Sequence, residues 1–297
     1  MWSTFLIDFL QKYDFPAEGS KSLLISLDQV LSHSQLSNVL LAAVQTYESS
    51  ATTQEAIMEL LHQVKTAAAE TDIPTETVEL LFFMLCMKPL KARFESAGLP
   101  EDYYAGVARD LRSKLNECYA VRGIWGSFVA HWFPRFFVPD RFVMGRLQYE
   151  LITIPEQYCT PETAHFANQP AINVHIPSGA PLRIEDVRAS MQEAAQFYGR
   201  HFPGGNVPFV CNSWLLFPGH KEMLPKNSGI RQFMEEFTLL STFEEPQRSN
   251  LWRLFLTDDV WELDKLPQDT SLQRAYVAWL KEGKPVGGGL GLRFIQA

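Results

Sequence analysis

Residues 141–153 read RFVMGRLQYELIT, and this stretch is where the character of the sequence changes. Apolar and polar residues alternate along it, with Leu147, Tyr149 and Leu151 on one side. Such alternation is the pattern of a half-buried β-strand, because successive side chains of a strand point to opposite faces. We therefore expect one strand over the whole stretch.

On the N-terminal side of this stretch, apolar residues recur every three or four positions, which is helical spacing. One stripe consists of Trp2, Phe5, Leu6, Phe9, Leu10 and Tyr13, and another of Ile57, Leu60, Leu61, Val64 and Ala68. Alternating β-branched residues are nearly absent there. The pattern predicts a helical N-terminal domain over residues 1–138, a bundle of about five or six helices.

On the C-terminal side, short strand patterns alternate with helical ones. We expect strands over residues 171–176, 208–217, 251–257 and 289–295, and helices over 184–201, 228–240 and 271–281. The glycine run 287–291 reads as a flexible turn before the last strand. This order predicts a second domain, residues 139–297, built on one sheet, and the whole chain is of the α+β class.

Composition excludes several classes of protein. The chain has 297 residues, a formal net charge of −8 and no basic block, which disfavours a nucleic-acid binder. Its four cysteines are far apart and form no C-x-x-C pair, so we expect free thiols in a reducing compartment. The seven histidines form no close ligand pair, so we expect no metal site. No segment resembles a targeting or membrane signal, and we expect a cytoplasmic protein with no membrane partner.

The first candidate for chemistry is the polar face of the strand at residues 146–150. Arg146, Gln148 and Glu150 are a cation, an amide and an anion at alternate positions. Solvent-facing strands commonly show this arrangement. The alternative is a polar row in a cleft, where Glu150 could act as a base and Arg146 could hold an anion.

The second candidate is the segment VHIPSGAPL, residues 174–182, which leads from a strand into a helix. Backbone amides of a helix's first turn point outward and favour an anion. The segment has no Walker lysine and no G-x-G-x-x-G, so an ordinary strand-to-helix turn is the other interpretation.

The third candidate is the segment CNSW, where Cys211 and Ser213 share a strand face beside Trp214. A nucleophile needs a base, and no G-x-S-x-G elbow is present. A cysteine in an apolar strand usually packs as an inert side chain.

At these segments the sequence resembles bacterial acyltransferase-domain proteins that join a helical N-acyltransferase N-terminal domain to a GNAT-like C-terminal domain. The matching pieces are GRLQYE at 145–150, VHIPSG at 174–179, FVCNSWLL at 209–216 and LPKNSGI at 224–230. The resemblance implies a GNAT-like mixed-sheet α/β domain, which binds acetyl-CoA or another acyl-CoA across a splayed pair of strands.

Within such a domain we hypothesise roles for individual residues, because Glu150 and His175 lie on polar faces of adjacent expected strands. Glu150 would be the base, and the thioester would lie beside His175. The substrate-binding candidates are Arg146, Gln148, Cys211, Ser213 and Trp214. The candidates for binding the cofactor are Ile176, Ser178, Gly179, Ala180, Leu182 and Arg183, in the turn expected to hold the pyrophosphate. That turn departs from the usual Q/R-x-x-G-x-G/A pattern, because Pro177 and Pro181 remove two amide donors.

The implied activity is transfer of an acetyl or other acyl group from acyl-CoA to a small-molecule amine, without a metal. A non-catalytic alternative also fits the departure in the turn: a GNAT-like domain that binds an acyl-CoA or another ligand as a sensor or interaction module. A third reading is a structural remnant without a ligand. The acceptor, the acyl chain length and the oligomeric state are not specified by the sequence.

Overall fold

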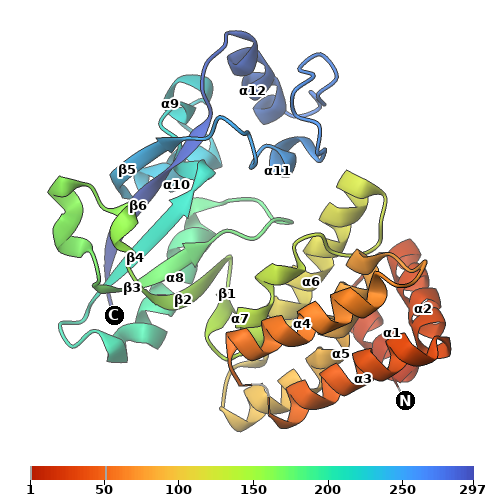
Figure 1. Ribbon diagram of the computed structural model, residues 1–297. Helices are drawn as coiled ribbons and strands as arrows, with labels where there is room; N and C mark the ends of the chain where they lie inside the picture. The colour runs from red at the N-terminus through yellow and green to blue at the C-terminus, as the bar shows by residue number, and fades with distance from the viewer. Residues whose placement is uncertain (1, 51) are drawn as a thin grey trace. The chain divides into compact units, whose positions relative to one another are not determined.

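The computed structural model describes residues 2–50 and 52–297 of the chain (Figure 1). By its internal packing the chain divides into two compact units, one ending at Val143 and the other spanning Met144–Ala297. Among the described residues, no helix is both long enough and apolar enough to cross a membrane.

The first unit is a helical bundle built around α5 (Thr75–Ser96), whose residues 78–87 are all buried. Their side chains are apolar around almost the whole circumference, which is typical of a central helix. The helix continues through Pro89, whose missing N–H leaves one helical hydrogen bond unformed. The other long helices are α1 (Trp2–Lys12), α2 (Ala17–Ser32), α3 (Ser34–Ser49), α4 (Gln54–Ala68) and α6 (Glu101–Arg122).

Aromatic side chains of the segment after α6 pack on the core of this bundle. The segment after α6 forms η1 (Ala130–Trp132) and α7 (Pro134–Phe137). Phe133 and Phe137 pack on Phe83 of α5, with ring centroids 5.1 and 4.9 Å away. Tyr47 contacts the Phe137 ring edge-on and donates a hydrogen bond to its carbonyl oxygen at 2.9 Å.

The second unit is organised by a mixed sheet whose six described strands have the order β1-β2-β3-β4-β6-β5. The pairs β2–β3, β4–β6 and β5–β6 are antiparallel, whereas β3 and β4 are parallel and are joined through α8 (Ile184–Tyr198). The strands are β1 (Arg141–Met144), β2 (Leu147–Thr153), β3 (Pro170–His175), β4 (Asn206–Ser213), β5 (Thr238–Glu244) and β6 (Gly287–Gln296).

Helix α8 covers one face of this sheet (Figure 1). Tyr149 of β2 points toward the helix, where its hydroxyl lies 2.8 Å from the Ser190 hydroxyl. The Tyr149 ring also meets Phe209 of β4 edge-on, with centroids 5.8 Å apart. Tyr198, at the other end of α8, donates to the Tyr149 carbonyl at 3.2 Å. This face is therefore fixed by packing and by hydrogen bonds to one helix.

The opposite face carries an apolar cluster and is covered by the segment that follows β2. That segment contains η2 (Glu156–Tyr158) and η3 (Pro161–Phe166). Buried residues of the cluster are Ile154, Ala171, Val210, Leu290 and Leu292, with Cys159 and Phe166 packed against them. The segment returns to β3 through a hydrogen bond from the Ile154 N–H to the Gln169 carbonyl at 2.9 Å.

Four expected elements differ from the observed ones. The strand expected over 208–217 ends at Ser213, where η5 (Trp214–Leu216) begins. The strand expected over residues 141–153 is two strands, since Gly145 has φ +57° and forms a turn with Arg146. The helix expected over 228–240 ends with α10 (Gly229–Glu235), and β5 begins three residues later. The strand expected over 251–257 contains the short helix α11 (Trp252–Phe255), which ends at Leu256 in the left-handed region.

The glycine run 287–291 is also not a flexible turn, because it is the start of β6. A Cβ on Gly287 would overlap the Phe243 carbonyl oxygen of the neighbouring strand, and one on Gly289 would crowd the Leu216 carbonyl. The glycines therefore allow close backbone approach.

A buried histidine lies after β4, in a cluster built from η5 (Trp214–Leu216), α9 (His220–Met223) and α12 (Ser271–Lys281). His220 is fully buried, its Nδ1 lies 3.3 Å from the Leu215 carbonyl, and its Nε2 lies 2.5 Å from the Tyr276 hydroxyl. A carbonyl can only accept, so Nδ1 carries the proton and Nε2 accepts from Tyr276. Burial lowers the pKa of His220 to about 4 from its usual 6.5.

Replacement of His220 by Gln is expected to weaken the dependence of the free energy of unfolding on pH below pH 6.5. Between pH 6.5 and about 4, the unfolded chain binds a proton at this position and the folded chain does not. Wild-type stability therefore falls as the pH drops through this window, by about 3 kcal/mol from this group alone. Urea unfolding measured across the window should show the gap between wild type and H220Q narrowing toward low pH. Parallel curves would contradict the assignment.

Candidate functional site

Strand register brings the predicted base and its neighbours together. In the β2–β3 pair, Gln148 lies opposite His175, and Glu150 lies opposite Asn173. Since alternate residues of a strand share a face, all four side chains lie on the face opposite α8. The sequence alternation indicated a shared face for Gln148 and Glu150, and the pairing adds Asn173 and His175 to it.

Glu150 is the centre of this group. Its Oε1 accepts a hydrogen bond from Asn173 Nδ2 at 2.9 Å and lies 2.8 Å from His175 Nε2. Asn173 Nδ2 is also 3.1 Å from His175 Nε2. The Asn173 amide therefore holds the carboxylate in place beside the imidazole.

The pair has one buried end and one accessible end. The Glu150 side chain is 4% exposed and the His175 side chain is 17% exposed. Gln148 is buried as well, so the solvent-facing interpretation of this strand face is wrong. An imidazole backed by a buried carboxylate can take a proton at Nδ1 while Nε2–H donates to the carboxylate, and the carboxylate then stabilises the imidazolium.

The pairing between strands β3 and β4 ends close to the Glu150–His175 pair. In the described sheet, their pairing consists of Ile172 with Phe209 and Asn173 with Val210. Both strands nevertheless continue, β3 to His175 and β4 to Ser213. The last pair of this register therefore lies two residues before His175.

The turn after β3 contains the residues predicted to bind a cofactor. Residues 176–183 connect His175 directly to α8, and Gly179 adopts φ +89°. The residues exposed in this turn are Ser178, Gly179, Ala180, Pro181 and Arg183, while Ile176, Pro177 and Leu182 are half-buried. The side chain of Arg183, the N-cap residue of α8, makes no capping hydrogen bond. First-turn amides of a helix point outward, an arrangement that favours a ligand with acceptor oxygens.

Arg146 does not share the Glu150 face, because it lies in the turn between β1 and β2. Its guanidinium donates to the carbonyl oxygens of Pro177, Ala180 and Pro181, at 2.9, 2.8 and 3.0 Å. The predicted placement of Arg146 in one polar row with Glu150 is wrong, since Gly145 breaks the strand just before it.

The contacts of the CNSW segment, residues 211–214, differ from those of the Glu150–His175 pair. Cys211 is fully buried on the α8 face, and burial raises the pKa of its thiol far above the usual value. The Ser213 hydroxyl accepts from the Leu215 N–H at 3.2 Å and so starts η5. Trp214 packs edge-on against His220 and Tyr276. These contacts give all three residues structural roles.

Asn173 was not among the predicted site residues. The alternation in AINVHI was the available signal, because it places Asn173 on the same face as His175.

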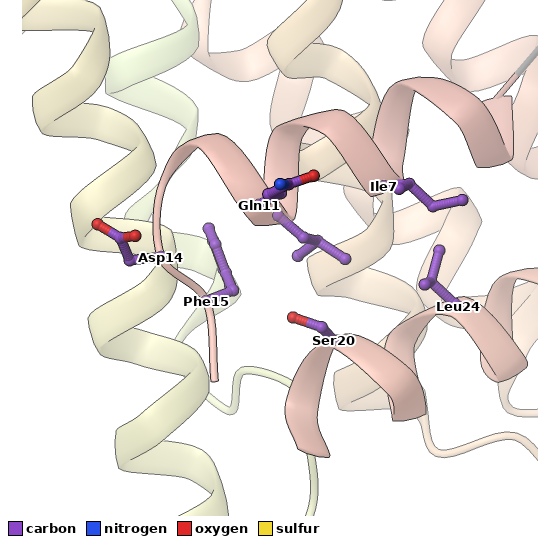
Figure 2. Close-up of a pocket in the computed structure, with 7 residues that line it drawn as sticks. Ile7, Gln11, Asp14, Phe15, Ser20 and Leu24 are labelled. Atoms are coloured by element: carbon purple, nitrogen blue, oxygen red, sulfur yellow. The ribbon is translucent and has the colours of Figure 1, made fainter. Parts of the chain in front are cut away.

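A surface pocket of about 370 Å³ lies in the first unit, between α1 and α2. Figure 2 shows Ile7 and Gln11 of α1, Ser20 and Leu24 of α2, and the linking residues around it. None of the predicted site residues lines this pocket. In the described part of the chain, no group of three His, Cys, Asp or Glu side chains could hold a metal ion.

Comparison with known proteins identifies the two halves. The family model described as the N-acyltransferase N-terminal domain matches residues 4–138, and that of the GNAT-like C-terminal domain matches residues 142–293. No curated protein matches the chain.

Several solved structures share the fold. One is an acyltransferase in complex with decanoyl-CoA and teicoplanin, with 22% identity and a TM-score of 0.71, covering 97% of this chain and 86% of that one. A mutant acyltransferase in complex with octanoyl-CoA has 21% identity and a TM-score of 0.72, with 96% and 86% covered. An acyltransferase with decanoyl-CoA has 19% identity and a TM-score of 0.62, with 97% and 98% covered. The expected fold class, a helical domain followed by a GNAT-like mixed sheet, is confirmed.

Thiol labelling tests the structural role of Cys211. Cys86, Cys118 and Cys211 are buried, while Cys159 is partly exposed. Iodoacetamide should therefore label the native chain at Cys159, as read by peptide mass spectrometry, and Cys159→Ser should abolish native labelling. In denaturant the remaining thiols should react. Labelling of Cys211 in native C159S protein would show instead that this thiol is accessible and reactive.

Proposed function

Because the chain belongs to the family with a GNAT-like C-terminal domain, here preceded by an N-acyltransferase N-terminal domain, we propose that it transfers an acyl group from acyl-CoA to the amine of a small molecule. The expected resemblance to this two-domain family is confirmed by both family models. One observation supports the activity most strongly. The Glu150–His175 pair lies where β3 and β4 stop pairing, directly before the turn that leads into α8.

The donor is an acyl-CoA, with its pyrophosphate against the amides of residues 178–183 and the N-terminus of α8. Outward-pointing amides and the positive end of the helix dipole both favour phosphate groups. Two solved structures of similar fold contain decanoyl-CoA and octanoyl-CoA. Thioesters of eight to ten carbons are therefore the first donors to test, beside acetyl-CoA.

The chemistry follows from the positions of the two side chains. The acceptor nitrogen attacks the thioester carbonyl carbon, a C–N bond forms, and the C–S bond breaks. His175 takes the proton that the nitrogen loses, and Glu150 stabilises the imidazolium. The departing thiolate of CoA receives that proton and leaves as the thiol. Positioning of the amine beside the thioester supplies the rest of the rate enhancement.

This assignment keeps Glu150 in the proton transfer but moves the direct contact to His175. The carboxylate is too buried to meet the acceptor itself, whereas the imidazole is the accessible end of the pair. Gln148 lies opposite His175 in the register and is as deeply buried as Glu150, so it would support the pair and not contact the acceptor. One structure of similar fold contains teicoplanin. For this chain the acceptor is proposed only as a small-molecule amine.

Calorimetric titration with CoA, combined with an assay of turnover, distinguishes an acyltransferase from a non-catalytic sensor. We expect CoA and octanoyl-CoA to bind with dissociation constants in roughly the micromolar range. Release of CoA thiol in the presence of a panel of primary amines should then be catalytic. Tight binding with no turnover on any amine would favour a non-catalytic sensor, and the absence of binding would reject both.

Replacement of Glu150 by Gln should slow the chemical step while leaving donor binding intact. Gln keeps the shape of the side chain and can still accept from Asn173, but it carries no charge to stabilise the imidazolium. We expect kcat to fall by about a hundredfold to a thousandfold, with the dissociation constant for CoA unchanged. H175Q should show the same pattern, and Glu193→Gln on the exposed side of α8 serves as the matched control. An unchanged kcat in E150Q would remove Glu150 from the mechanism.

A further inference from the structure

Arg146 is bound to the turn that lies between His175 and α8. Three of its nitrogens donate to three backbone carbonyls of that turn: Nη1 to Pro177, Nη2 to Ala180 and Nε to Pro181. A guanidinium presents its donors in a rigid planar fork, so these bonds fix the turn's carbonyls in space.

When the direction of a backbone carbonyl is fixed, the direction of the N–H group that follows it is fixed as well. Within residues 2–50 and 52–297 there are no cis peptide bonds. In a planar trans peptide the C=O and the following N–H point in opposite directions. The Pro177 and Pro181 carbonyls point to Arg146, so the N–H groups of Ser178 and Leu182 point to the other side of the turn. The unit between Ala180 and Pro181 has no N–H to orient.

The turn is held from a second side by α10. A Cβ on Gly229, the first residue of that helix, would overlap the Leu182 carbonyl oxygen. Leu182 therefore directs its carbonyl to the protein as well. The Arg183 carbonyl accepts the Val187 N–H at 3.1 Å as part of α8.

Arg146 is itself anchored on α8 through the turn that carries it. The Ser190 hydroxyl donates to the Met144 carbonyl at 2.5 Å and accepts from the Leu147 N–H at 3.2 Å. These two bonds bracket Gly145 and Arg146. The guanidinium is thus attached to the same helix whose N-terminus follows the turn.

We infer that Arg146 is a positioning residue for the acyl donor, holding residues 177–183 so that backbone amides, and not carbonyls, face the pyrophosphate. This inference rests on the proposed function. Two prolines leave this turn few amide donors, and each one that is lost to a rotated peptide has no replacement. Arg146 acts through the backbone and makes no contact with the donor itself.

Two donors that share an acyl chain separate this role from a general effect on folding. Octanoyl-CoA contains the pyrophosphate, and S-octanoyl-pantetheine lacks it. For R146Q we expect KM for octanoyl-CoA to rise by about tenfold or more, with kcat within about twofold of wild type. KM for S-octanoyl-pantetheine should stay unchanged. Arg200→Gln, an exposed arginine past the end of α8, is the matched control and should behave as wild type.

Two further variants separate geometry from charge. R146K keeps the charge but has a single nitrogen, so it should lose octanoyl-CoA affinity almost as R146Q does. Free guanidinium at low millimolar concentration should restore octanoyl-CoA affinity in R146A, because the ion can occupy the space between the three carbonyls.

Each remaining outcome overturns the inference in a recognisable way. Wild-type affinity in R146K would show that the charge alone acts on the donor. Unchanged KM in R146Q would reject the positioning role and leave the proposed function intact. Loss of turnover with both donors would show that Arg146 maintains the fold and not the turn. If wild-type protein binds no CoA at all, the proposed function fails, and this inference fails with it.

Discussion

The antiparallel register between β2 and β3 is the constraint on which the rest of the site depends. It sets Glu150 against Asn173 and Gln148 against His175. A slip of one residue would turn Glu150 to the α8 face and leave its carboxylate buried without His175. The other face prevents this slip, because Tyr149 is tied to Ser190 and to Tyr198 on α8. The polar pair is therefore specified by apolar and hydrogen-bonded packing on the opposite side of the sheet.

One helix connects this packing to the end of the domain where we propose that the donor binds. The middle of α8 holds the β1–β2 turn through Ser190, and that turn carries Arg146 back to the residues in front of the helix. The side chain of its N-cap residue, Arg183, makes no capping hydrogen bond. Stability and function are thus built from the same element, since a shift of α8 would move both the register of β2 and the amides before Ile184.

The sequence was informative where patterns are local and less so where contacts are distant. Alternation at residues 147–151 and in AINVHI located β2 and β3, and helical spacing located the bundle, because burial of one face imposes those periods. The glycines at 145 and 287–289 were misread. Gly145 forms a turn where the sequence pattern predicted a continuous strand. Gly287, Gly288 and Gly289 begin a strand where the pattern predicted a turn. Each depends on neighbours far away in sequence, such as Ser190 and Phe243. Likewise, the Glu150–His175 contact joins two strands whose register no local pattern encodes.

The arrangement also explains how an acidic chain can suit an anionic donor. The net charge of −8 is distributed over the whole molecule, and physiological salt screens charges beyond about 8 Å. Near the turn, the charges and dipoles that would act on a bound anion are those within a few ångströms of it. Glu185 and Asp186 in the first turn of α8 oppose an anion there, while the amides of the turn and of the helix favour it. Dipoles attract only when they are correctly oriented. In the proposed function, affinity for the donor is therefore governed by the geometry of a few peptide units, and so by the residue that holds their carbonyls.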